Sequence, residues 1–110
     1  MRQYEIWWAD LPEPAGRLPV LLLSRNDAYS YLSKFIAVEI TTTIRRIASE
    51  IPLGEEEGLP AVCVANCDSV RMVPRLSLMK RAGQLAPERQ VEAKRAMGSA
   101  LGWRELTDIE

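Results

Sequence analysis

Short apolar segments, separated by prolines, glycines and polar turns, fill the first two thirds of the chain. Residues 4–10 are rich in aromatic and β-favouring side chains, residues 19–24 form an apolar run headed by proline, and residues 35–41 are again β-favouring. Residues 49–53 alternate between polar and apolar positions. Each segment has the length of a strand, so the pattern predicts four β-strands, with an irregular loop at residues 11–16 between the first two.

Two further strands are predicted at residues 61–66 and 69–73, joined as a hairpin through Cys67 and Asp68. A helix is predicted over residues 87–101, because Pro87 suits the first helical position and Gly102 suits the end. One face of that helix is apolar, formed by Ala93, Ala96, Met97, Ala100 and Leu101.

Closely spaced strands with one late helix and no alternation of strands and helices predict a mainly β fold. We expect a compact antiparallel barrel or curled sheet over about residues 3–85, a C-terminal helix over about 87–101 and a short polar tail at 103–110, all in a single domain, 1–110. The apolar fraction of 47% and charged fraction of 26% are those of a globular protein. The start of the chain does not look like a signal peptide, so we expect a cytoplasmic protein without membrane contact.

Histidine is absent, which removes the usual general acid and base at neutral pH and leaves arginine, threonine, serine and carboxylates for any catalysis. Cys63 and Cys67 lie four apart in a predicted strand, about 13 Å from each other, so they are not expected to bridge. We interpret them as buried structural thiols, and predict neither a metal site nor another cofactor.

The net charge is −1, but residues 71–95 carry seven basic residues against two acidic ones. Such an excess usually marks a solvated face, and it is also compatible with nucleic-acid binding.

Several segments in order resemble the MazF/PemK toxin family. They are Glu5–Leu11, Glu13–Ser24, Ile40–Thr43, Glu50–Leu53, Gly58–Pro60, Asn66–Asp68 and Leu85–Glu88. The resemblance covers about residues 4–102.

This resemblance implies an SH3-like barrel of the type shared with CcdB toxins, working as a homodimer. It implies a metal-independent endoribonuclease that cuts single-stranded RNA, with the RNA's 2′-hydroxyl as nucleophile and with 2′,3′-cyclic phosphate and 5′-hydroxyl ends as products. The implied partners are RNA and a cognate, MazE-like antitoxin with an acidic, disordered C-terminal part, and DNA would be contacted only indirectly, through the antitoxin.

Three residues are the catalytic candidates that follow from the resemblance. Thr41 matches the family's catalytic threonine, although a β-branched residue at a strand end is also ordinary packing. Glu13 matches a loop acid, and alternatively is a solvated carboxylate. The family's arginine position is occupied by Leu18, with Arg17 one residue earlier; in a regular strand that shift turns the side chain to the opposite face, so Arg17 would serve only from an irregular loop.

The substitution at Leu18 predicts attenuated cleavage, by about 10²–10³-fold if no other cation replaces the arginine. Candidate RNA-binding residues line the predicted strand ends: Leu18, Arg25, Thr42, Thr43, Arg45, Arg46, Asn66 and Arg71. Trp7 and Trp8 are adjacent in a strand and should face opposite ways.

Two other functions stay open at this point. One is a relative that binds RNA or protein and has lost cleavage. The other is a CcdB-like toxin that binds DNA gyrase.

Overall fold

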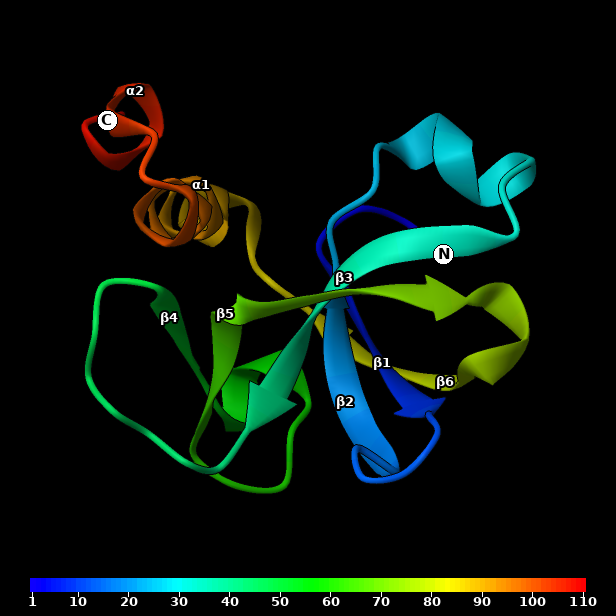
Figure 1. The fold of residues 1–110 in the computed structure, drawn as a ribbon. Helices are drawn as coiled ribbons and strands as arrows, with labels where there is room; N and C mark the ends of the chain where they lie inside the picture. Colours follow the sequence, from blue (N-terminus) through cyan, green and yellow to red (C-terminus); the bar gives the residue numbers. More distant parts are fainter.

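The computed structural model describes residues 1–110, and six strands dominate it (Figure 1). They form one antiparallel sheet in the order β4-β5-β3-β2-β1-β6. The strands are β1 (Glu5–Asp10), β2 (Arg17–Leu22), β3 (Lys34–Thr41), β4 (Glu50–Leu53), β5 (Cys63–Pro74) and β6 (Leu78–Gln84). The predicted mainly β fold with a C-terminal helix is confirmed.

The sheet curls so strongly that the residues following the edge strand β4 contact the other edge strand, β6. The short 3-10 helix η2 (Glu55–Glu57), which follows β4, lies against β6, where backbones approach too closely for any side chain. A Cβ at Gly83 would lie 2.1 Å from the Glu57 carbonyl oxygen, and one at Gly58, whose φ is +84°, would lie 2.0 Å from the Ala82 oxygen. Glycine at both positions is therefore what lets the curl close.

Both faces of the sheet are buried at its centre, which explains the unbroken apolar run in β2. Strand alternation sends Leu21 into one cluster, with Ile6, Val38 and Ile40, under the C-terminal helix. Val20 and Leu22 enter the other cluster. Its members are Ala9, Leu11, Val20, Leu22, Tyr29, Phe35, Ala37 and Val73, and the 3-10 helix η1 (Asn26–Ser30) contributes Tyr29 to it.

The predicted hairpin between residues 61–66 and 69–73 is wrong, because these residues form one strand, β5. Its register on β3 jumps from Val38↔Val70 to Glu39↔Asn66, which leaves Cys67, Asp68 and Ser69 as a bulge. The strand bends sharply there (Figure 1).

Strand β6 was not predicted. Lys80, Arg81 and Gly83 interrupt its apolar pattern, and it pairs with β1 through two register shifts. These irregularities hide the alternation that identifies a strand.

The C-terminal helix matches its prediction closely. A 3-10 turn, η4 (Pro87–Arg89), leads into α1 (Gln90–Leu101), which ends at Gly102 with φ +73°. Leu101, predicted on the apolar face, is instead 46% exposed. The predicted polar tail contains a short helix, α2 (Arg104–Thr107), that packs back on α1. None of the helices combines the length and the hydropathy that a membrane-spanning helix requires.

The two cysteines are buried and free, as predicted. Burial raises the pKa of the Cys67 thiol to about 12 and also raises that of Cys63. Both are therefore protonated, unreactive core residues at neutral pH.

Candidate functional site

The β1–β2 loop is a closed turn that presents Glu13. The Leu11 N–H donates to the Gly16 carbonyl at 3.0 Å, and Gly16 takes a φ of +64°. The Glu13 carboxylate folds back over this glycine, and a Cβ there would lie 3.3 Å from its Oε1. The proline-rich sequence between the strands therefore holds one carboxylate at the rim of the sheet.

Beside this loop is an open hollow of about 550 Å³, which we call the Glu39 hollow. It contains an ion pair between Arg71 Nη1 and Glu39 Oε2 at 2.7 Å, with the two side chains 31% and 29% exposed. The lining residues are Pro12, Glu13, Pro14, Ala15, Glu39, Ser69, Val70 and Arg71. Of the sequence candidates, the structure brings Glu13 and Arg71 together here.

Arg17 is not brought into this hollow. Strand β2 begins at Arg17, where its Cα partner is Asp10, so the regular alternation applies to Arg17 and Leu18. Leu18 packs with the second apolar cluster, on the face of Val20, and Arg17 turns to the opposite face. Arg17 could have faced the Glu39 hollow only from an irregular loop, and that loop ends at Gly16, one residue before it.

On that opposite face Arg17 lines a hollow of about 430 Å³ with Trp8, Met79 and Lys80, which we call the Trp8 hollow. Neither Arg17 nor Lys80 forms an ion pair. Trp7 packs on the second cluster instead, so the prediction that Trp7 and Trp8 face opposite ways is confirmed.

Thr41 is the last residue of β3 and is half-buried. Its Oγ1 accepts the Thr43 N–H at 3.1 Å, which leaves its own hydroxyl hydrogen free to donate. Alternation turns its side chain to the face of Glu39, about 7 Å along the strand. The residue also borders a small hollow of about 90 Å³ with Trp8 and Pro19, which includes neither Glu39 nor Arg71.

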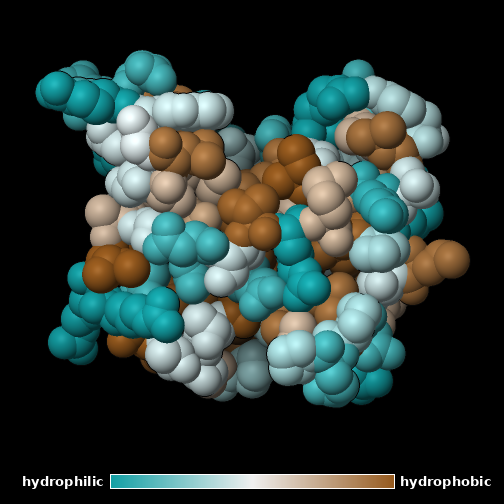
Figure 2. All heavy atoms as spheres, in the orientation of Figure 1, coloured by the Kyte–Doolittle hydropathy of each residue, from teal (hydrophilic) through white to brown (hydrophobic).

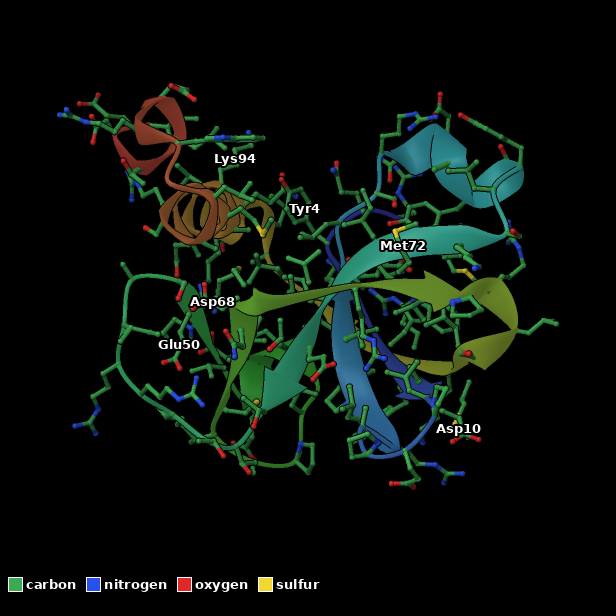
Figure 3. The ribbon with its side chains drawn as sticks, in the orientation of Figure 1. Tyr4, Asp10, Glu50, Asp68, Met72 and Lys94 are labelled. Carbon is green, nitrogen blue, oxygen red and sulfur yellow. The ribbon has the colours of Figure 1, made fainter.

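The middle of the Thr42–Ser49 loop is held by the carboxylate of Glu50 (Figure 3). Glu50 accepts the Arg45 N–H at 3.1 Å and the Arg46 N–H at 2.9 Å, and Arg46 has a left-handed φ of +58°. The Arg45 and Arg46 guanidinium groups form no ion pair. With Thr42 and Thr43 exposed as well, this loop offers uncompensated positive charge close to Thr41.

Asn66 has a local role in the β5 bulge, where its Oδ1 accepts the Asp68 N–H at 3.0 Å. Asp68 in turn accepts the Ser49 hydroxyl at 2.7 Å, which ties the bulge to the end of the Thr42–Ser49 loop (Figure 3).

Arg25 precedes η1, at the opposite end of β3 from Thr41, and it pairs with Asp27 at 2.7 Å and contacts Tyr31. The structure does not bring Arg25 to the Thr41 end.

Glu39 was not predicted as a site residue, although the sequence contains a feature that could have identified it. A single acidic residue interrupts the apolar run from Phe35 to Ile40, at a position whose neighbours are buried. A carboxylate there needs a partner, which Arg71 supplies from 32 residues away. No group of three His, Cys, Asp or Glu side chains gathers in an arrangement suited to a metal ion.

Residues 2–101 match the model of a family described as PemK-like, MazF-like toxins of type II toxin–antitoxin systems. The chain is 33% identical over 103 residues to a Mycobacterium tuberculosis protein named "Probable endoribonuclease MazF2", covering 93% of this chain and 99% of that one.

Among solved structures, the Mycobacterium tuberculosis toxin MazF-mt6 superposes with a TM-score of 0.83 at 30% identity, covering 89% of this chain and 96% of that one. An endoribonuclease solved in complex with its cognate antitoxin, from a mycobacterial species, superposes with a TM-score of 0.81 at 25% identity, covering 93% and 95%.

Proposed function

The chain belongs to the PemK-like, MazF-like toxins of type II toxin–antitoxin systems, and we propose that it is an endoribonuclease that cuts single-stranded RNA at short sequence motifs without a metal ion. The observation that carries this proposal is the near full-length match to relatives named endoribonucleases. The same match favours RNA cleavage over the gyrase-binding alternative.

The proposed reaction is an attack of the RNA's 2′-hydroxyl on the adjacent phosphorus, which yields a 2′,3′-cyclic phosphate and a 5′-hydroxyl end. Such a reaction needs hydrogen-bond donors and positive charge around the five-coordinate phosphorus. Thr41 is the proposed donor, because its hydroxyl hydrogen is free and its position is fixed by the Thr43 N–H. Glu13 is proposed to face the RNA from the rim of the Glu39 hollow.

The proposed RNA path follows the Thr42–Ser49 loop, where Arg45 and Arg46 contact phosphates and Thr42 and Thr43 offer hydroxyls. Arg17 is proposed as a further phosphate contact beside Trp8, instead of as the catalytic cation. The RNA-binding roles expected for Leu18, Asn66 and Arg25 stay predictions, with Arg25 placed too far along β3 to meet the same phosphate.

We also propose a homodimer. Ile36, Val70 and Met72 are 43%, 45% and 54% exposed, and Ile36 and Met72 are cross-strand partners on β3 and β5. Together they form an apolar strip on β3 and β5, and Figure 2 shows exposed apolar side chains over these strands. A second copy covering this strip would remove it from water.

The proposed inhibitor is a cognate antitoxin, since a relative is solved in complex with its cognate antitoxin. An acidic segment of the inhibitor would lie along the Thr42–Ser49 loop, where it would meet Arg45 and Arg46.

The test is incubation of the purified protein with a long natural RNA, with and without EDTA. We expect cleavage in both, with 5′ ends that polynucleotide kinase labels directly and 3′ ends that require opening of a cyclic phosphate before extension. Thr41→Val keeps the shape and removes the donor, so it should lower the rate by about 10²–10³-fold, whereas Thr41→Ser should retain more activity. Thr107→Val, on the distant α2, is the matched control.

Intact RNA at high enzyme excess would refute the proposal. RNA binding without cleavage would support the binding-module alternative, and gyrase-linked DNA breaks in cells with intact messenger RNA would support the gyrase alternative.

A further inference from the structure

We propose that Glu39 and Arg71 act as a pair in this cleavage, Glu39 as the base that takes the 2′-hydroxyl proton and Arg71 as the cation that binds the scissile phosphate. The inference rests on the proposed function and names the proton acceptor and the phosphate-binding cation of that reaction.

The pair lies on the face that carries Thr41. In β3 the side chains of Ala37, Glu39 and Thr41 share one face, and Arg71 joins it from β5 as the cross-strand partner of Ala37. From β2, Val20 is the partner of Glu39, and Leu18 lies two residues along on the same face. A phosphate beside Glu39 would be within reach of the Arg71 guanidinium, which contacts the Glu39 carboxylate at 2.7 Å.

Three other arginines near the sheet are held or turned elsewhere, while Arg45 and Arg46 lie on the Thr42–Ser49 loop after the end of β3. Arg17 faces the Trp8 hollow. Arg75 donates to two backbone carbonyls at 2.7 Å and stacks on Phe35, and Arg89 is bound to Glu57 and Glu92 at the far side of the sheet. Arg71 lines the Glu39 hollow together with Glu13 and Glu39, and its volume of about 550 Å³ is within the range of about 300–1,000 Å³ usual for small-molecule sites.

The Glu39 hollow contains two carboxylates, Glu13 and Glu39, which would repel a phosphate, and the ion pair offsets this repulsion. At rest Glu39 and Arg71 cancel each other, at 2.7 Å. When Glu39 takes the proton of the 2′-hydroxyl it becomes neutral, and the positive charge of Arg71 is released just as the phosphate gains a second negative charge. Charge is thus supplied only when the transition state develops.

The step is balanced without any co-reactant except water. The 2′-oxygen forms a bond to phosphorus while its proton passes to Glu39. The bond from phosphorus to the 5′-oxygen breaks, and the 5′-oxygen leaves with the electron pair and takes a proton from water. Glu39 then returns its proton to solvent, and Arg71 pairs with it again.

The test compares single-turnover cleavage rates of the full chain and its variants on the same long RNA. We expect Glu39→Gln and Arg71→Gln each to lower the rate by about 10²-fold or more, and Arg71→Lys to lower it less, since a charge remains without the planar fork. Glu13→Gln should lower it less than Glu39→Gln. Arg81→Gln breaks another cross-strand ion pair, with Glu5 at 3.2 Å, and should leave the rate within threefold of wild type.

A second variant protects the test against a simple loss of folding. Leu18→Arg adds a guanidinium on the same face. Combined with Arg71→Gln, it should raise the cleavage rate at least tenfold, whereas combined with Glu39→Gln it should leave the rate unchanged. Thermal unfolding midpoints should be nearly unchanged in the Glu39 and Arg71 variants, because a partly exposed ion pair contributes only about 0–1 kcal/mol.

Failure of the proposed function and failure of the Glu39–Arg71 assignment give different results. Wild-type protein that cuts no RNA overturns the proposed function and this inference with it. Active wild type with Glu39→Gln or Arg71→Gln within threefold of it overturns the inference alone, as does a larger loss in Glu13→Gln than in Glu39→Gln.

Discussion

The Thr42–Ser49 loop depends on Glu50, so removing this carboxylate should release the loop that carries Arg45 and Arg46. In Glu50→Ala the N–H groups of both arginines lose their only protein acceptor. Hydrogen bonds to a charged acceptor contribute about 1.5–3 kcal/mol each, and the exposure of this loop favours the lower end. A change of about 1.5 kcal/mol in the opening free energy corresponds to about a 12-fold change in amide exchange.

Hydrogen exchange at the Arg45 and Arg46 amides is the direct assay. We expect both to exchange about tenfold faster in Glu50→Ala, and less than that in Glu50→Gln, which keeps one acceptor oxygen. RNA affinity should fall more in Glu50→Ala than in Glu50→Gln, because ordering a mobile loop on binding costs conformational entropy. Unchanged exchange at both amides would show that Glu50 does not hold the loop, and faster exchange with unchanged affinity would refute the link to RNA.

Other predictions concern the frame of the fold and its response to pH. Gly83→Ala should lower the free energy of unfolding in urea by about 1–3 kcal/mol, since its Cβ would lie 2.1 Å from a backbone carbonyl oxygen. Gly54→Ala, whose Cβ would have nothing within 4 Å, is the control and should leave it unchanged. Equal urea midpoints for the two variants would contradict the close approach at Gly83. The raised pKa of Cys67, about 12, predicts stability that is fully present below about pH 8.5 and declines as pH rises from there toward 12, and Cys67→Ala should remove that part of the decline. The hydrogen bond from Arg89 holds the pKa of Glu92 below its usual range, so Glu92→Gln should cost up to about 1 kcal/mol near neutral pH, and this difference should vanish as pH falls through that lowered pKa.

Much of the architecture was predictable because it is encoded locally. The apolar run of β2, the alternation of β4, and the proline and glycine that bound the C-terminal helix each follow from a few neighbouring residues. The predictions that failed are those that depended on pairing. β6 lacks a clean pattern because bulges interrupt it, and Cys67-Asp68 resembles a turn in sequence although the partner strand β3 pulls it into a bulge.

The candidate site divides in the same way. The strand end at Thr41, the loop that carries Glu13 and the leucine at the expected arginine position can all be read from the residues in order. Which charged groups meet cannot be read in this way, since strand register turns Arg17 away and places Arg71 beside Glu39 from 32 residues along the chain. Residue type and periodicity are local properties, whereas long-range strand pairing sets the face on which a side chain lies and the partner that it contacts there.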